Sequence, residues 1–494
     1  MVQDIEEADV YDVAIMSQLE RAKLLSTKLG ANIYVKREDL QPVHSFKIRG
    51  AYNKMRNLSN DQKSKGVLAA SAGNHAQGVA LSAKKLDIKA TIVMPSTTPQ
   101  IKIDAVKQYG AEVILYGDTY SDAADYAKKL QREHQLTYIH PFNDDEVIAG
   151  QGTVAVEILE QLPEVDYVFV PIGGGGLISG MAAYLKHHKP EVKIIGVEPE
   201  DSSAMSRSIS ADKLVSLKHV GIFADGVAVK QVGENTFGLV KKFVDEFMTV
   251  STDEICSAIK DIYQDTRVIV EPSGALSVAG LQRYRQSHPE LVGKHIVTVN
   301  SGANMTFEQL QFIAERTLIG SGNESLYSIE LPERPRALKG LIDNTINGLS
   351  ISEFNYRKSD NEKANIFVGI VYKNKTEKDK FESRLSEQGY KMVDLSNDDI
   401  AKTHIKHMIG GKPPAGTKEQ IYDFEFPERP GALSDFLNSL DEGINISLFH
   451  YRYTGGDRSR VLMGLETDRE LKQSSLPSGF ILKKAASTSV KLFL

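Results

Sequence analysis

Four consecutive glycines at positions 173–176, in the stretch PIGGGGLISG, point to the first chemistry in this sequence. Glycine loses more backbone freedom on folding than any other residue, so such a run indicates that another group approaches the chain closely. An apolar run precedes the glycines and a helical stretch follows them. Several backbone N–H groups would then be free to bind an anion at the helix N-terminus, where the helix dipole also favours negative charge. The loop alone therefore favours a bound phosphate over close helix packing, and it does not identify the phosphate.

Two familiar phosphate-binding loops do not match this one. A nucleoside-triphosphate loop needs a lysine after its last glycine, and none follows here. The G-x-G-x-x-G pattern of dinucleotide sites fits no register of residues 173–180. Glu198, at the end of the next apolar run, nevertheless mimics the acid that binds a ribose, so a variant NAD site stays open as an alternative.

Lys47, in VHSFKIRGA, is the second chemical candidate because apolar Phe46 and Ile48 flank it at the start of a helical stretch. Most lysines in a first helical turn are surface residues. In an apolar setting, however, desolvation lowers the pKa of the amine and makes it a nucleophile toward aldehydes. Two more polar turns follow apolar runs, SAGNHAQG at 71–78 and NSGAN at 300–304.

The composition limits the class of protein. The chain has 494 residues, 41% of them hydrophobic, and a formal net charge of -6, which argues against a dedicated nucleic-acid surface. Its one cysteine, Cys256, allows no internal disulfide and no thiolate metal site, and it indicates a reducing compartment, the cytoplasm. The apolar window at 166–185 is interpreted as strand, turn and helix rather than a membrane span, because four glycines and a proline interrupt it. We expect no metal site and no membrane partner.

The elements that must position these residues follow an alternating pattern. Between residues 31 and 200, short apolar runs that do not alternate with polar residues are separated by amphipathic helical stretches, and the pattern resumes at 295–300. Such runs predict a mainly parallel sheet with helices on both faces. The sequence therefore predicts an α/β catalytic domain over residues 1–320.

The rest of the chain contains an internal repeat. YSIELPERPRAL at Tyr327 recurs as YDFEFPERPGAL at Tyr422, and SEFNYR recurs as SLFHYR at the same offset of 95 residues. The order of elements predicts two α+β modules of the βαββαβ type, at 325–397 and 420–494, joined by a linker that includes 410–417. Pro477 interrupts the stretch where the second copy should carry its second helix.

Five motifs, SFKIRGA, SAGNHAQG, GGGGL, EPSGA and SGAN, together resemble one family. In this order and spacing they are similar to the pyridoxal-phosphate enzymes of the tryptophan-synthase β-subunit type (fold type II), and within it to the serine/threonine dehydratases. The resemblance covers roughly residues 5–318. The C-terminal repeat resembles the paired ACT-like regulatory modules of the biosynthetic threonine dehydratases.

The resemblance implies a cofactor, pyridoxal 5′-phosphate, and a role for each motif. Lys47 would hold the cofactor covalently and take the proton from the substrate Cα. Asn74 would bind the ring hydroxyl, and Ser301 would face the pyridine nitrogen. The phosphate would lie on the backbone of Gly173, Gly174, Gly175, Gly176 and Leu177, and the substrate carboxylate would meet free N–H groups of Ser71, Ala72, Gly73, Asn74 and His75.

The reaction implied is the deamination of L-threonine to 2-oxobutanoate and ammonia by α,β-elimination, the first step of isoleucine biosynthesis, with L-serine as a poorer substrate. The ACT-like pair would bind isoleucine as an inhibitor and valine as its antagonist. Tyr356 and Tyr451, at equivalent positions of the repeat, are candidate effector contacts, although strand aromatics also serve for packing. The family also implies a homotetramer.

Four alternatives remain from the sequence. A serine racemase would carry a serine where this chain has Ala72, and a catabolic dehydratase would usually lack the two-copy tail. An NAD-dependent enzyme would use the glycines and Glu198. An amino-acid-sensing protein could keep the fold with an inert catalytic half.

Overall fold

The computed structural model divides the chain into two compact units, Met1–Phe307 and Glu308–Leu494. The first lies within the predicted catalytic domain and the second includes both predicted modules, whose outer limits stay predictions. The structure describes residues 1–332, 337–346, 348–355, 363–407, 418–429, 432–441, 444–452, 457–485 and 487–493, so the predicted linker at 410–417 lies outside them.

The larger sheet of the first unit has six strands in the order β1-β2-β10-β7-β8-β9. Every neighbouring pair is parallel except β1, which runs antiparallel to β2 at one edge. The strands are β1 (Leu19–Arg21), β2 (Asn32–Arg37), β7 (Tyr167–Pro171), β8 (Lys193–Pro199), β9 (Glu246–Val250) and β10 (His295–Asn300).

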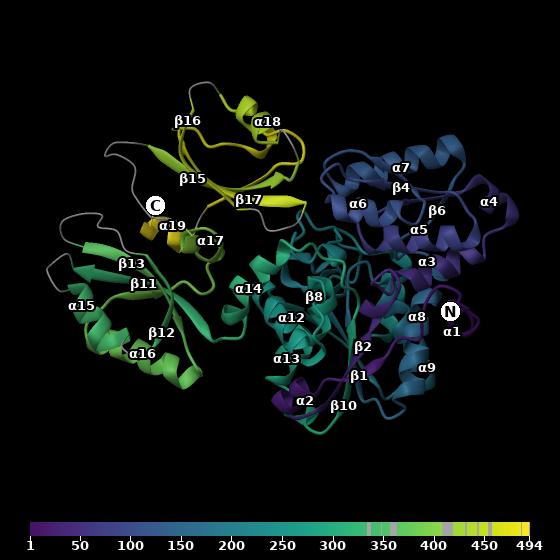
Figure 1. Ribbon diagram of the computed structural model, residues 1–494, viewed down its shortest axis with the longest axis horizontal. Coiled ribbons are helices and arrows are strands. Elements are labelled where there is room, and N and C mark those ends of the chain that lie inside the picture. The colour runs from purple at the N-terminus through teal and green to yellow at the C-terminus, as the bar shows by residue number, and fades with distance from the viewer. Residues whose placement is uncertain are drawn as a thin grey trace. The chain divides into compact units, whose positions relative to one another are not determined.

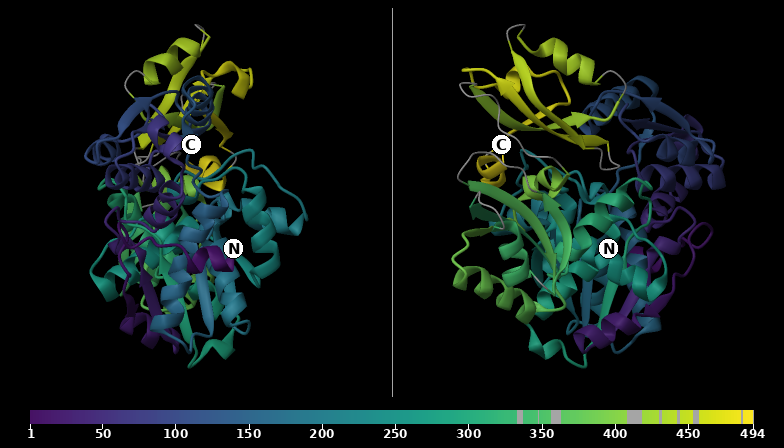
Figure 2. Two further views of the ribbon diagram at one scale, coloured as in Figure 1. Left: turned by 90° about the vertical axis from the view of Figure 1, so that its right-hand side faces the viewer. Right: turned by 60° about the vertical axis from the view of Figure 1, so that its left-hand side comes forward.

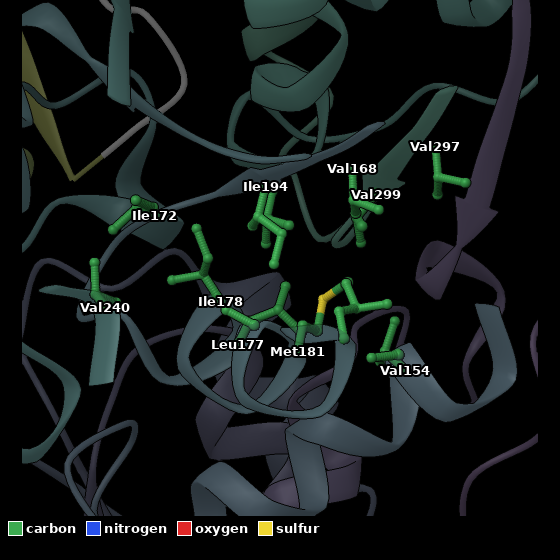
Figure 3. Packing of buried hydrophobic residues seen from close by; sticks show 14 of the residues in the cluster. Val154, Val168, Ile172, Leu177, Ile178, Met181, Ile194, Val240, Val297 and Val299 are labelled. Carbon is green, nitrogen blue, oxygen red and sulfur yellow. The ribbon is translucent and has the colours of Figure 1, made fainter. Parts of the chain in front are cut away.

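Helices cover both faces of this sheet, as its apolar strands predict. On one face, Leu177 and Met181 of α9 (Gly176–His188) pack beneath Val168 of β7 and Val297 of β10 (Figure 3). The next residue of β7, Phe169, points to the other face and lies 5.5 Å from the ring of Tyr284 in α13 (Pro272–Arg285). The other helices around this sheet are α2 (Lys23–Leu29), α8 (Asp145–Gln161), α11 (Glu234–Phe243) and α12 (Thr252–Thr266).

A second parallel sheet, which the sequence pattern did not separate from the first, has the order β5-β4-β3-β6. Alternate residues of β3 point to opposite faces: Val67 and Ala69 pack against α5 and α6, whereas Leu68 and Ala70 pack against α7. Helices α5 and α7 lie on opposite faces of this sheet (Figure 1). These elements are β3 (Val67–Ala70), α5 (Asn74–Leu86), β4 (Ala90–Met94), α6 (Gln100–Lys107), β5 (Glu112–Leu115), α7 (Tyr120–His134) and β6 (Thr137–Tyr138). The remaining helices of the first unit are α1 (Val2–Glu6), α3 (Lys47–Arg56), α4 (Asn60–Lys65) and α10 (Ala204–Ser210).

The first C-terminal module confirms the βαββαβ order. Its antiparallel sheet has the order β12-β13-β11-β14, with α15 and α16 on one face (Figure 1). Helix α14 (Gln309–Gly320) leads into it. The elements of the module are β11 (Glu324–Pro332), α15 (Ala337–Leu341), a short π-helix (Ile342–Ile346), β12 (Ser350–Asn355), β13 (Lys363–Val371), α16 (Lys375–Glu387) and β14 (Met392–Asp394).

The second module repeats this topology with one loss. Its sheet has the order β16-β17-β15-β18, and Figure 2 shows the strong twist of both module sheets. A single 3-10 turn at Gln473–Ser475 stands in place of the second helix, just before Pro477, as the sequence predicts. Its elements are β15 (Glu419–Pro427), α18 (Ala432–Ser439), β16 (Asn445–Arg452), β17 (Arg458–Glu466) and β18 (Ile481–Lys484).

One apolar cluster joins the two modules. Leu326 and Phe367 of the first module and Leu462 of the second pack with Ile400 from α17 (Asp399–Thr403), the helix between them. The C-terminal helix α19 (Thr488–Phe493) closes the same cluster through Val490. The modules therefore share a core. Within the part of the chain that the structure describes, we find no helix long and apolar enough to cross a bilayer.

Candidate active site

Lys47 is the first residue of α3, and its side chain is half-buried. Its ammonium Nζ donates to the carbonyl of Pro141 at 2.8 Å and lies 5.3 Å from the centre of the Phe46 ring. Burial lowers the pKa of Lys47 to about 8, although the negative charge of Glu271 opposes the shift. More of this amine than of an ordinary lysine is therefore neutral near physiological pH, and the neutral state is the one that attacks an aldehyde.

The segment before Lys47 is hydrogen-bonded to the loop after β10. The Phe46 N–H donates to Ser301 O at 3.3 Å, the Ala303 N–H donates to His44 O at 2.9 Å, and Ser45 forms a β-bridge with Gly302. Ser301 itself is buried, and its Oγ lies 3.3 Å from Ser273 O. These bonds place Ser301 beside Lys47, as the predicted site requires.

The glycine loop connects β7 to α9 and presents a row of backbone donors. Within the described chain, the N–H groups of residues 173–177 have no partner. Gly175 has a φ of +93°, a conformation that favours glycine, and the carbonyl of Gly174 is held by Thr236 Oγ1 at 2.7 Å. Unpaired donors at the N-terminus of α9 form a suitable cradle for a phosphate.

The same glycines are also required by packing on their other side. A Cβ at Gly174 would lie 2.1 Å from the Phe142 ring, and one at Gly176 would lie 3.1 Å from the Phe142 backbone. A Cβ at Gly173 would lie 2.9 Å from Val227. Close packing therefore also requires glycine here, against Phe142 and Val227 rather than against a long helix, and phosphate binding at this loop stays a prediction. Phe142 directly follows Pro141, the partner of Lys47, so the loop also lies near the amine.

The loop after β3 offers fewer free donors than the sequence predicted. The Ser71 N–H donates to Val93 O at 3.1 Å, and the Gly73 N–H lies 3.3 Å from Ser71 Oγ. The N–H groups of Ala72, Asn74 and His75 have no partner in the described chain. A Cβ at Gly73 would meet nothing within 4 Å, so this loop borders open space.

Two imidazoles near the lysine are neutral. His75 Nε2 lies 2.8 Å from Ile139 O, and burial together with the Lys47 charge lowers its pKa to about 3. His140 accepts the N–H groups of Phe142 and Asn143 on Nδ1, and burial and Lys47 lower its pKa to about 4. Both rings therefore keep the chain turned around Pro141 without adding charge.

The amide of Asn74 is held at both ends by residues to which the sequence interpretation gave no role. Its Nδ2 donates to Glu271 Oε1 at 2.7 Å, and its Oδ1 accepts from Asn304 Nδ2 at 2.6 Å. Both partners belong to motifs that the sequence singled out, EPSGA and SGAN. A glutamate next to a helix-starting proline was the available signal, but the pattern does not say where its side chain points.

Taken together, the donors suit pyridoxal 5′-phosphate. The unpaired N–H groups of 173–177 match a phosphate, the desolvated Lys47 amine matches an aldehyde, and a free N–H on Asn74 matches a ring oxygen. The geometry also contradicts the NAD alternative, in which Glu198 would bind a ribose. The Glu198 carboxylate is buried, and it accepts the N–H groups of Met205 and Ser206 at 2.8 Å, so it caps α10.

The two candidate effector residues are not placed by the structure. Tyr356 lies outside the described residues. Tyr451 belongs to β16, but its side chain lies outside the described part of the chain. Their role stays a prediction.

Comparisons with known proteins agree with this site. Residues 12–302 match the family model "Pyridoxal-phosphate dependent enzyme", and residues 315–405 and 412–481 match "C-terminal regulatory domain of Threonine dehydratase". The chain is 47% identical to L-threonine dehydratase biosynthetic IlvA of Burkholderia multivorans, over 99% of this chain and 97% of that protein.

Solved structures give the same picture for the first unit. The processed form of threonine deaminase isoform 2 from Solanum lycopersicum is 50% identical, with a TM-score of 0.63, and the match covers 64% of this chain and 91% of that one. Maize serine racemase is 34% identical, with a TM-score of 0.60, over 65% of this chain and 98% of that one. The match to Burkholderia multivorans threonine dehydratase, unlike the match to the racemase, includes both modules. The chain therefore belongs to the biosynthetic threonine dehydratases, which are pyridoxal-phosphate-dependent enzymes with a C-terminal regulatory domain.

Proposed function

We propose that this chain deaminates L-threonine to 2-oxobutanoate and ammonia by α,β-elimination and accepts L-serine less well. The observation that carries the proposal is the position of the Lys47 amine, desolvated and beside both the glycine cradle and the loop after β3. The name of the full-length relative, L-threonine dehydratase, supports the choice of threonine.

When bound, the cofactor supplies an electron sink that makes the proton on the substrate Cα removable. The chain's own residues do the rest. Lys47 holds the cofactor and moves that proton, because its lowered pKa of about 8 lets the amine exchange a proton close to neutral pH. The N–H groups of Ala72, Asn74 and His75 receive the substrate carboxylate, and the donors of 173–177 hold the phosphate. Ser301, whose loop is bonded to the segment before Lys47, would meet the ring nitrogen.

We also propose that the reaction is the first step of isoleucine biosynthesis and that isoleucine inhibits it, with valine as the antagonist. The support is the regulatory domain, which is folded as two modules on a shared core. Tyr356 and Tyr451 are the proposed effector contacts because they occupy equivalent positions of the repeat. A homotetramer and a cytoplasmic location complete the proposal; the single buried Cys256 is compatible with a reducing compartment.

The catalytic proposal is tested on the purified full-length holoenzyme by following 2-oxobutanoate from L-threonine. Lys47→Ala should abolish turnover, while the surface variant Lys65→Ala should match the wild type. Wild-type rates in Lys47→Ala would overturn the assignment of the lysine. A chiral assay on L-serine addresses the racemase alternative: D-serine formed as fast as ammonia would replace the present proposal.

The regulatory proposal is tested by the same assay with isoleucine, then with isoleucine and valine together. We expect inhibition that valine relieves. If Phe at both Tyr356 and Tyr451 leaves the response unaltered, neither hydroxyl takes part. An enzyme that is active on threonine and indifferent to isoleucine would refute the feedback proposal alone.

A further inference from the structure

Glu271 is a buried glutamate that does not do what its position in the fold suggests. It immediately precedes α13, with Pro272 as the first helical residue, and its exposed fraction is 2%. A residue at this position usually caps the helix by accepting an N–H from its first turn. The Glu271 side chain accepts no N–H of this turn; it accepts the Ser273 hydroxyl instead and extends toward α5 and the loop after β10.

Three donors from three elements meet this carboxylate. Oε1 accepts from Asn74 Nδ2 at 2.7 Å and from Ser273 Oγ at 2.5 Å. Oε2 accepts the backbone N–H of Asn304 at 2.8 Å. The side chain of Asn304 in turn donates to Asn74 Oδ1 at 2.6 Å and to Val43 O at 2.7 Å. Glu271 and Asn304 therefore hold Asn74 from opposite ends.

This arrangement allows only one orientation of the Asn74 amide. A carboxylate only accepts hydrogen bonds, and the nitrogen of an amide only donates them. Turning the amide over would set Asn74 Oδ1 against the Glu271 carboxylate and Nδ2 against the Asn304 amide nitrogen, which are two repulsive contacts. In the orientation observed, Nδ2 donates one of its two N–H bonds to Glu271, and its second N–H is left for another acceptor.

The charge of Glu271 also reaches Lys47. Burial raises the pKa of Glu271, and Asp225 raises it further, while Ser273, Asn74 and Lys102 lower it. A carboxylate here opposes the effect of burial on Lys47 and raises the pKa of that amine. The other titratable side chains that face Lys47 are His75 and His140, with pKa values lowered to about 3 and about 4, so both are uncharged at neutral pH.

We propose that Glu271 is a positioning residue that locks the Asn74 amide with one N–H directed at the cofactor ring and sets the charge balance at Lys47. The proposal rests on the proposed pyridoxal-phosphate site and goes beyond it in naming the residue that orients its parts. It separates two effects of one carboxylate, a geometric one on Asn74 and an electrostatic one on Lys47.

Three substitutions separate the two effects. Glu271→Gln removes the charge and one acceptor site, Glu271→Asp keeps the charge but shortens the reach, and Asn304→Ser releases Asn74 Oδ1 with no change of charge. The matched control is Glu198→Gln, because Glu198 is equally buried, also accepts two N–H groups, and makes no contact with Asn74.

Two measurements on the full-length chain give readouts other than turnover. The first is retention of pyridoxal phosphate by the holoenzyme during dialysis, followed by its absorbance. The second is the pH dependence of the rate at which the stripped enzyme takes up pyridoxal phosphate again. For the wild type we expect this rate to rise with pH and to have its midpoint near pH 8, where the Lys47 amine loses its proton.

Glu271→Gln should weaken retention about tenfold, the effect of losing one charge-assisted hydrogen bond. It should also move the uptake midpoint to lower pH. Glu271→Asp and Asn304→Ser should weaken retention and keep the wild-type midpoint. Glu198→Gln should change neither.

Wild-type retention together with an unshifted midpoint in Glu271→Gln would overturn the inference. Equal losses in Glu198→Gln would do so as well, because they would reveal a general effect of buried carboxylates. If Glu271→Gln does not fold, normal retention in both Glu271→Asp and Asn304→Ser overturns it. A wild type that binds no pyridoxal phosphate would instead refute the proposed function.

Discussion

The catalytic unit and the C-terminal unit each hold an arginine between two carboxylates with a second cation alongside, but only the C-terminal group has a carboxylate that is half-exposed to water. In the catalytic unit, Arg49 binds Glu38 at 2.8 Å and Glu157 at 2.6 Å, and Lys36 binds Glu157 at 2.6 Å. All four side chains are 0% exposed. We call these four residues the closed network.

The corresponding group in the C-terminal unit is the open network, Arg316, Asp399, Arg460 and Asp423. Asp399 lies 2.6 Å from Arg316 and 2.8 Å from Arg460, and Arg460 also pairs with Asp423. The side chain of Asp399 is 48% exposed, and that of Arg460 is 14% exposed. Water can therefore replace part of what these groups lose when a partner is removed.

The difference in exposure indicates that the two networks have different structural roles. The closed network fixes α3 two residues beyond Lys47 to α8 and to the N-terminal segment, and any break leaves an ion buried without a partner. The open network joins α14, α17 and β17, which are the helix that leads into the modules, the helix between them, and a strand of the second module. A joint that water can enter costs less to rearrange, which suits a regulatory unit.

Glu157→Gln should show the largest effect. A neutral amide leaves Lys36 and Arg49 buried with too little negative charge, so the free energy of unfolding should fall by about 3–5 kcal/mol. Urea unfolding followed by circular dichroism measures the loss, with cofactor release as the signal specific to the catalytic unit. Glu160→Gln, on the exposed side of the same helix, is the control and should stay within about 0.5 kcal/mol.

The pH dependence of the free energy of unfolding tests the same ion pairs of Glu157. Burial opposes ionisation of Glu157, but Arg49 and Lys36 hold its pKa below the usual range. A carboxyl with a lowered folded pKa contributes stability that is complete above its unfolded pKa, about 4.3, and is lost as the pH falls through the folded value. The difference between wild type and Glu157→Gln should therefore be constant near pH 7 and shrink in acid. A difference that grows in acid would contradict the closed network as described.

Much of the molecule could be predicted from the sequence, for reasons that the two units share. Local patterns carry local structure: the apolar runs marked seven strands between residues 31 and 200, the repeat marked both modules, and Pro477 marked the missing helix. The glycine run indicated unpaired backbone donors at a strand-to-helix turn, and the structure has them, although packing against Phe142 requires the same glycines.

The parts that could not be predicted depend on residues far apart in the sequence. The division of the strands into two sheets follows from packing between layers, which periodicity does not record. Glu271 and Asn74 are separated by 197 positions, and helix-cap chemistry alone would have turned that glutamate toward its own helix. Both networks also join residues far apart in the sequence: Arg49 and Glu157 are 108 positions apart, and Arg316 and Asp399 are 83 positions apart.

Replacing arginine by lysine at equivalent places sharpens the comparison. Arg49→Lys keeps the charge but loses the planar fork that binds Glu38 through Nε and Nη2 and Glu157 through Nη1, so stability should fall by about 2–4 kcal/mol. Turnover should fall too, because α3 carries Lys47. Arg460→Lys should cost less, about 1–2 kcal/mol, since water reaches Asp399 although not Asp423. Equal losses at the two positions, measured by urea unfolding, would remove the distinction between the networks.

Asp399→Asn should have a smaller effect on stability and a specific effect on regulation. Asp399 is half-exposed, so water already weakens its pairs with the two arginines, and we expect a loss of about 1–2 kcal/mol, seen in the unfolding of the C-terminal unit. Basal turnover should be unchanged, and more isoleucine should be needed for half-inhibition, because α14 would no longer be tied to the second module. Asp379→Asn, on the exposed face of α16, is the control. Wild-type inhibition in Asp399→Asn would show that the joint does not carry the signal.

Added salt should change the stability of the open network and not that of the closed network, and this is the smallest effect that we expect. Screening acts over about 10 Å at 0.1 M salt and about 3 Å at 1 M, and it acts much more on exposed charges than on buried ones. Raising sodium chloride from 0.1 to 1 M should therefore reduce the difference in the free energy of unfolding between Asp399→Asn and the wild type by a few tenths of a kcal/mol. This is roughly half of the contribution of an exposed ion pair. The gap between Glu157→Gln and the wild type should not change, because no ion reaches side chains that are 0% exposed. Differences between variants are compared at each salt concentration, so a general effect of salt on folding cancels. If both gaps shrink in parallel, water and ions reach the closed network too, and the contrast in burial between the two networks does not govern how they respond.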